Sequence, residues 1–141
     1  MSKFYEQFCA PPSLGLNPKS LSAEELARQA DWSARTFGPA TVRGPLGPLD
    51  HLEKEIEEVR RAHKHRRRCR TASAEVKQRA HANELEEWAD LLILVFDGAM
   101  RSGFSPVQIF RAYRSKLTVN RQREWPDWRT AAPDKAIEHV R

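Results

Sequence analysis

The chain has 141 residues, a formal net charge of +5, 30% charged residues and two cysteines. This length favours one domain that buries a core and gains further stability from self-association. No run of about 18 or more apolar residues is present, which argues against a membrane span. Met1–Ala10 also lacks the basic and apolar segments of a secretory signal. We therefore predict a cytoplasmic protein whose positive charge favours polyanionic partners, either nucleic acid or small phosphates.

Residues 1–20 contain prolines and scattered aromatic residues without periodicity, which predicts an irregular arm ahead of a single domain at residues 21–141. Ser22 stands three residues before Glu25. This capping-box spacing predicts a helix that runs to about Thr36. Cys9 and Cys69 lie far apart in the sequence and do not form a disulfide framework, which fits a reducing compartment.

A loop rich in glycine and proline follows at 37–48, long enough to line a pocket. Asp50 is the expected cap of a second helix, because apolar residues then recur at spacings of three and four up to Val59. Between Arg60 and Asn83 the chain becomes strongly basic and loses this periodicity. The second helix either extends through this segment as a solvated arm or breaks near 71–73, and the pattern leaves both possibilities open.

The segment 84–100 is apolar almost all round, which predicts a buried central helix beginning near Asn83 and ending between Gly98 and Gly103. Ser105 and Pro106 then open a further helix, with proline at its first position. No run of alternating polar and apolar residues predicts a strand. The expected fold is therefore all-α, a bundle of about four or five helices.

Acidic residues lie on two of these helices at matching spacings. Glu55 and Glu58 form one i, i+3 pair, and Glu87 and Asp90 form another. Antiparallel packing of the two helices would bring all four carboxylates to one locus, where their charge needs compensation. Oxygen ligands of this kind suit Mg²⁺ or Mn²⁺. Asp97, two turns beyond Asp90, extends the predicted metal site; the alternative for Glu55 and Glu58 is an ordinary solvated face.

A metal site beside basic helices indicates a substrate that carries a pyrophosphate group. Lys116, Asn120 and Arg123 would complete its phosphate clamp, unless they are ordinary polar surface residues of a helix. Trp32 and Phe37 would stack on a purine beside the pocket loop, or else pack in the core or at a subunit interface.

The order of these motifs resembles that of the MazG-like, all-α nucleoside triphosphate pyrophosphohydrolases. Further segments, together with this order, look like the dATP/dGTP diphosphohydrolase (MazZ-type) subfamily, which is often phage-encoded. These segments are Ala27–Ser33, Phe37–Pro39, Asp50–His51, Leu85–Trp88, Trp125–Arg129 and Pro133–Arg141. The resemblance covers about residues 21–141. The chain departs from the compact pattern at His63–Ala82, which is longer and more basic than the usual connection between the two metal-bearing helices.

The resemblance implies hydrolysis of purine deoxynucleoside triphosphates, dGTP and dATP foremost, to the monophosphate and pyrophosphate. It implies Glu55, Glu58, Glu87 and Asp90 as Mg²⁺ ligands. It also implies a homodimer or homotetramer in which neighbouring chains help to close the sites. In a phage, such an enzyme would act in the host cytoplasm and shape the nucleotide pool before replication.

The basic segment supports two rival interpretations. His63, His65, Cys69 and His81 resemble a zinc cluster, but their spacing matches no zinc-ligand pattern and arginines interleave it. The run from Arg60 to Arg70 would suit a helical nucleic-acid-binding module held by counterion release. Against this rival, the run lacks interleaved aromatic residues and a helix-turn-helix pattern, so we do not expect nucleic acid as the partner.

Overall fold

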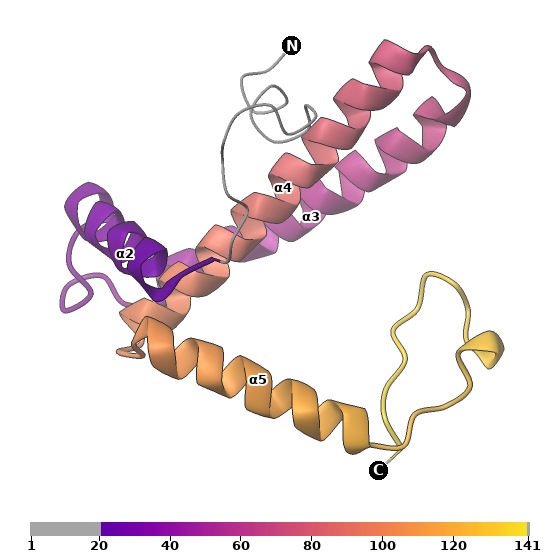
Figure 1. Ribbon diagram of the computed structural model, residues 1–141. Coiled ribbons are helices and arrows are strands. Elements are labelled where there is room, and N and C mark those ends of the chain that lie inside the picture. Colours follow the sequence, from indigo (N-terminus) through magenta and orange to yellow (C-terminus); the bar gives the residue numbers. More distant parts are fainter. Residues whose placement is uncertain (1–20, 141) are drawn as a thin grey trace. The chain divides into compact units, whose positions relative to one another are not determined.

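The structure is a computed structural model that describes residues 21–140, so the predicted N-terminal arm lies outside the described residues. It contains the helices α2 (Ala23–Phe37), α3 (Leu46–Arg68), α4 (Ala74–Arg101) and α5 (Pro106–Gln122), and the short 3₁₀ turns η1 (Cys69–Thr71) and η2 (Trp128–Thr130). Residues 21–140 contain no strand. The predicted all-α fold is therefore confirmed (Figure 1). The chain divides into two compact units after Pro106, with α2 to α4 in the first.

Helix α2 begins as the sequence predicts. The Ser22 hydroxyl accepts a hydrogen bond from the Glu25 amide at 3.2 Å, and the Glu25 carboxylate accepts one from the Ser22 amide at 2.8 Å. The two amides would otherwise lack partners at the helix start. Leu26 and Ser33 are the buried side chains of this helix. The helix ends at Phe37 and is followed by Gly38, whose φ of 94° is readily adopted only by glycine.

Helix α3 begins earlier than predicted, at Leu46, so the expected cap at Asp50 is wrong. Pro45 has a helical backbone conformation, and Pro48 lies in the first turn, where a proline removes no intrahelical hydrogen bond. Asp50 is instead inside the helix, where its carboxylate accepts a hydrogen bond from the Lys54 ammonium at 3.0 Å.

The second helix both extends into the basic segment and ends within it, so each of the two possibilities left open by the sequence is partly correct. Helix α3 continues to Arg68, η1 reverses the chain, and the Ser73 hydroxyl caps α4 by accepting a 3.4 Å hydrogen bond from the Val76 amide. The predicted start of the central helix at Asn83 is therefore wrong. Buried Ala62, Ala80 and Ala82 pack at this end of the pair, and alanines are too small to produce a strong apolar periodicity.

Helices α3 and α4 form a long antiparallel hairpin and make the most extensive contact between elements (Figure 1). Helix α2 packs on α4 within the same unit. The prediction that the central helix is buried on all sides is wrong for the first unit taken by itself, because α2 and α3 leave part of α4 uncovered. Trp88, Leu92 and Val95 are each about half exposed, at 51%, 56% and 50%.

The second unit contains α5 from Val107 onward and the C-terminal segment. The Trp125 indole donates a 2.8 Å hydrogen bond to the Asn120 carbonyl, and its ring lies 5.9 Å from the His139 ring. These contacts fold the C-terminal segment back on the end of α5. Among the described residues, no helix is both long and apolar enough to cross a membrane.

Candidate active site

Three carboxylates meet where α3 and α4 cross. Glu55 and Glu58 lie one turn apart on α3, and Glu87 faces them from α4; each offers one oxygen within 4.8 Å of the others. The i, i+3 spacing places the two α3 acids on one face, and the antiparallel pairing brings the α4 acid opposite them. All three side chains are partly buried. We call these residues the carboxylate cluster.

The other two predicted acids lie outside this cluster. Asp90 is exposed and lines the adjoining pocket, close enough for its charge to act on Glu87. Asp97 is buried and forms a 2.9 Å ion pair with Arg101 through its Oδ2 atom. The charge of Asp97, which needed a compensating group in the predicted core, is therefore balanced by a guanidinium one turn away.

The negative charges of the cluster repel one another, and the effect is resolved at Glu87. Partial burial raises the pKa of Glu87, and the charges of Glu58, Glu55 and Asp90 raise it further. Two basic side chains contact the cluster at its edge. Glu55 contacts His51 at 2.9 Å, and Glu58 contacts Arg61 at 3.2 Å.

Glu87 has a neutral partner, the Asn83 amide, which donates a hydrogen bond to it at 3.3 Å. Three oxygen donors from partly buried acids, without thiolate or imidazole between them, form a set that suits a hard divalent cation.

A mainly apolar pocket of about 740 Å³ adjoins the cluster. Glu55 and Asp90 lie in its wall together with Trp32 and Phe37. The two aromatic rings meet edge to face, 5.4 Å apart and at 86°. The loop predicted at 37–48 is shorter in the structure, residues 38–45, and this pocket loop contributes to the wall together with the first turn of α3. A planar aromatic ligand would find stacking surfaces here, in a pocket whose lining also contains acidic groups.

Arg101 fixes this pocket, and sequence analysis did not single it out. Its guanidinium is buried and donates hydrogen bonds to the Ser33 hydroxyl at 2.6 Å, the Gly38 carbonyl at 3.1 Å and the Arg43 carbonyl at 2.6 Å. One side chain thus ties α2, the pocket loop and α4 together. The sequence signal that could have identified Arg101 is its i, i+4 spacing from Asp97, which allows an ion pair on one helix face. Such a pair has a large effect on stability only when both residues are buried, and burial cannot be read from the spacing.

The residues of the rejected zinc cluster have other contacts. His63 contacts Glu84 at 2.9 Å, and His81 contacts Arg66 at 3.1 Å. Arg66 also contacts the nearly buried Glu84 at 2.6 Å. Glu84 of α4 therefore neutralises part of the positive charge of the basic segment on α3.

Lys116, Asn120 and Arg123, the predicted phosphate clamp, belong to the second unit. Arg123 donates a 3.3 Å hydrogen bond to the Asn120 side-chain oxygen, and Lys116 is exposed. Their role in binding substrate remains a prediction.

An all-helical fold with carboxylates gathered across a helix pair is what the resemblance to the MazG-like nucleoside triphosphate pyrophosphohydrolases implies. A family model described as dATP/dGTP pyrophosphohydrolase matches residues 68–141, more than half of the chain. The chain therefore belongs to the dATP/dGTP pyrophosphohydrolase family. The matched range contains Glu87 and Asp90, whereas Glu55 and Glu58 precede it.

A second comparison finds the Eaa protein of Salmonella phage P22, which is 40% identical over 47 residues. This match covers 33% of the chain and only 15% of the phage protein. It is a local similarity to a longer phage protein. No solved structure matches the chain.

Proposed function

We propose that this protein hydrolyses purine deoxynucleoside triphosphates, dGTP and dATP foremost, to the monophosphate and pyrophosphate. The observation that carries the proposal is the carboxylate cluster of Glu55, Glu58 and Glu87, assembled from two helices in a chain of the dATP/dGTP pyrophosphohydrolase family. The family description supplies the substrate class, and the cluster supplies groups suited to the chemistry. The similarity to a phage protein supports a role in a phage nucleotide pool, within the host cytoplasm.

Mg²⁺ is the cation that we propose for the cluster, and Mn²⁺ has similar ligand preferences. Glu55, Glu58 and Glu87 would hold it, with Asp90 joining from the adjoining wall. A bound divalent ion supplies Lewis-acid stabilisation of phosphate oxygens during hydrolysis. Asp97 would act less directly, because its Oδ2 atom already contacts Arg101.

The pocket beside the cluster would hold the nucleoside. Trp32 and Phe37 offer ring surfaces to a purine, and the largely apolar wall excludes water from the base. We propose Lys116, Asn120 and Arg123 as additional phosphate contacts. Two cationic groups and a neutral amide donor suit phosphate oxygens.

Self-association as a homodimer or homotetramer is part of the proposal. The half-exposed apolar residues of α4 support it, because a chain that remains monomeric rarely leaves so many large apolar side chains on one helix uncovered. A second copy of the chain packed against α4 would bury these apolar side chains. Helix α4 would then be buried on all sides, as its apolar sequence predicts.

The test is product analysis. The protein is incubated with each dNTP and Mg²⁺, and the nucleotides and phosphates are separated by ion-exchange chromatography. Equal amounts of dNMP and pyrophosphate from dGTP or dATP, abolished by EDTA, are expected. Release of orthophosphate with dNDP, or no turnover of any dNTP, would overturn the proposal.

A matched pair of substitutions assigns the activity to the cluster. Glu58→Gln should reduce kcat/KM by at least about a hundredfold, since it removes a charged ligand. Glu57→Gln, one residue earlier, removes the same charge from an exposed side chain and should leave activity unchanged. Equal activity of the two variants would show that Glu58 has no catalytic role.

A further inference from the structure

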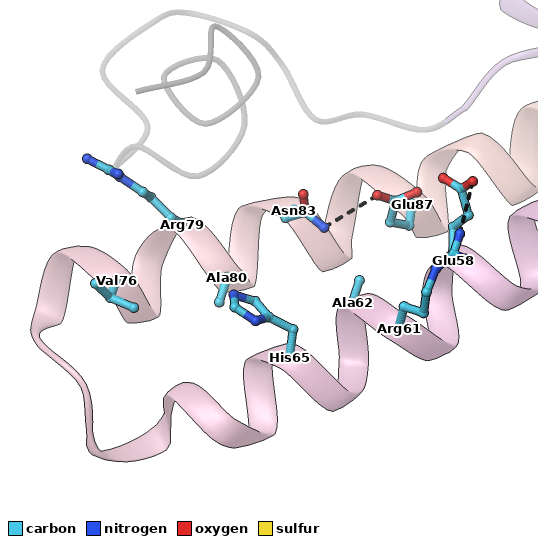
Figure 2. Close-up of a pocket in the computed structure, with 9 residues that line it drawn as sticks. All are labelled: Glu58, Arg61, Ala62, His65, Val76, Arg79, Ala80, Asn83 and Glu87. Carbon is cyan, nitrogen blue, oxygen red and sulfur yellow. Dashed lines mark hydrogen bonds and ion pairs between the residues drawn. The ribbon is translucent and has the colours of Figure 1, made fainter.

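A second concavity, of about 540 Å³, begins at the carboxylate cluster and continues along the hairpin towards its turn (Figure 2). Glu58 and Glu87 belong both to the cluster and to this concavity. The remaining lining residues are Arg61, Ala62, His65, Val76, Arg79, Ala80 and Asn83. The cluster thus lies between this concavity and the aromatic pocket, which shares Glu55 with it.

The pocket and the concavity, on the two sides of the carboxylate cluster, are lined by different kinds of side chain. Towards the start of α3, the pocket wall is apolar and aromatic, with Trp32 and Phe37. Towards the end of α3, the concavity presents Arg61 and His65 above a floor of buried alanines. Figure 2 shows the Arg61 side chain reaching back to Glu58 and the His65 ring lying over the gap between the helices. A nucleoside triphosphate has a matching arrangement of groups along its length, because an aromatic base lies at one end and a strong negative charge at the other.

We propose that this concavity binds the β- and γ-phosphates of the substrate, and hence the departing pyrophosphate, through Arg61 and His65. The inference rests on the proposed function and adds a direction to it: the base lies on the Trp32 side of the cluster and the terminal phosphates lie on the Arg61 side. Hydrolysis adds the oxygen of one water to one phosphorus of the α–β bridge. The bridging P–O bond to that phosphorus breaks, its electron pair stays on the other fragment, and the water's proton is released to solvent.

Arg61 is well placed for this role. Its side chain is 71% exposed, and its contact with Glu58 at 3.2 Å uses one of its Nη atoms. A guanidinium has five N–H donors, so donors remain for phosphate oxygens. Its charge also offsets the repulsion between a triphosphate and the nearby carboxylates.

The other basic side chains of the concavity contribute less than Arg61. Figure 2 shows Arg79 extending away from α3, and its guanidinium contacts Glu75 at 2.6 Å. The hydrogen-bond partner of His65 among the described residues is the Cys69 sulfur, at the long distance of 3.5 Å, so its ring can turn towards a phosphate. Arg61 is therefore the main determinant and His65 the second.

The chain offers a close control. Arg60 contacts Glu57 at 3.5 Å with the same i, i+3 spacing and a similar exposure, but neither residue lines a described concavity. Arg61→Gln and Arg60→Gln therefore remove equal charge from equally exposed positions. Circular dichroism spectra that match the parent are the check that both variants fold.

The experiment measures inhibition of dGTP hydrolysis by each product in the presence of Mg²⁺. For Arg61→Gln, the inhibition constant of inorganic pyrophosphate should rise about tenfold while that of dGMP stays within about twofold, since a charge-assisted hydrogen bond to one end only is lost. His65→Gln should produce a smaller change in the same direction. Arg60→Gln should alter neither constant.

Equal changes in both inhibition constants, or an equal effect of Arg60→Gln, would overturn the proposal, since either result would mean a general effect of charge. Calorimetric titration with inorganic pyrophosphate and Mg²⁺ separates this proposal from the proposed function. If no dNTP is hydrolysed but Arg61→Gln selectively weakens pyrophosphate binding, the site stands while the activity fails. If dGTP is hydrolysed and pyrophosphate binds both proteins equally, the activity stands and the site is wrong.

Discussion

Glu87 occupies a position where its negative charge is disfavoured, because it is partly buried and faces other carboxylates. Proteins keep such groups at sites where a ligand compensates the charge, and functional sites are enriched in perturbed pKa values. We therefore expect Glu87 to link the stability of the fold to the binding of the proposed cation. This link can be measured without any assay of activity.

Glu87→Gln should raise the Tm measured in EDTA and weaken the rise in Tm that we expect Mg²⁺ to cause in the parent. The raised pKa means that the folded state disfavours the charged carboxylate, so the penalty is complete above the folded pKa. It disappears as the pH falls through the folded pKa towards the ordinary value. The Tm advantage of Glu87→Gln should therefore be present at neutral pH and shrink on acidification, as followed by thermal unfolding across a pH series. An advantage that grew on acidification would contradict this assignment.

Arg101 is the residue whose loss should destabilise the first unit most. Arg101→Met leaves Asp97 as a buried charge without its partner, and removing one member of a buried pair costs about 3–5 kcal/mol. Arg129→Met breaks an exposed 3.0 Å ion pair with Asp127 and should cost at most about 1 kcal/mol. Urea unfolding of both variants compares the two costs, and similar values would contradict the structural role of Arg101.

At the scale of elements, local signals predicted helix starts well where a side chain caps the backbone. The Ser22–Glu25 box is present, and Pro106 begins α5. Prediction failed at Leu46, which no side chain caps, and at Ala74, where the Ser73 hydroxyl caps the helix but the residues that follow lack apolar periodicity. There, small residues and tertiary packing of the hairpin determine the boundary.

Part of the candidate site could also be predicted from local sequence spacing. The i, i+3 pairs gave the correct faces of α3 and α4, so Glu55, Glu58 and Glu87 could be brought together from sequence. The ion pair of Asp97 and the contacts of Arg101 depend on the path of the pocket loop. No local pattern encodes that path, because it follows from packing between distant segments.

The Ser73 cap can be tested independently of the site. Ser73→Ala removes the hydroxyl that accepts from the Val76 amide and should cost about 1 kcal/mol, as typical for such caps. Catalytic activity at saturating Mg²⁺ should be unchanged, because Ser73 lies several helical turns from Glu87. Urea unfolding and a kcat measurement on the same preparation test both statements, and a large loss of kcat would show that the turn contributes to the site.

At the scale of the whole molecule, the uncovered apolar residues of α4 bear on assembly. Leu92→Glu should shift the proposed oligomer towards monomer in sedimentation velocity and should lower Tm, because a charge would be buried in the interface. Gln78→Glu introduces the same charge at an exposed position of the same helix and should have no effect. A parent protein that sediments as a monomer at every concentration would contradict self-association.

The antiparallel hairpin also has a consequence for folding kinetics. Its two helices are joined by a short turn, so their contacts can form progressively from η1 outward, which favours rapid folding. Glu55, Glu58 and Glu87 lie away from that turn, and their mutual repulsion opposes the last stage of pairing. We therefore expect the cluster to form late in folding, so that a cation bound to it would act mainly on the native state. Mg²⁺ should consequently slow unfolding of the hairpin much more than it accelerates folding.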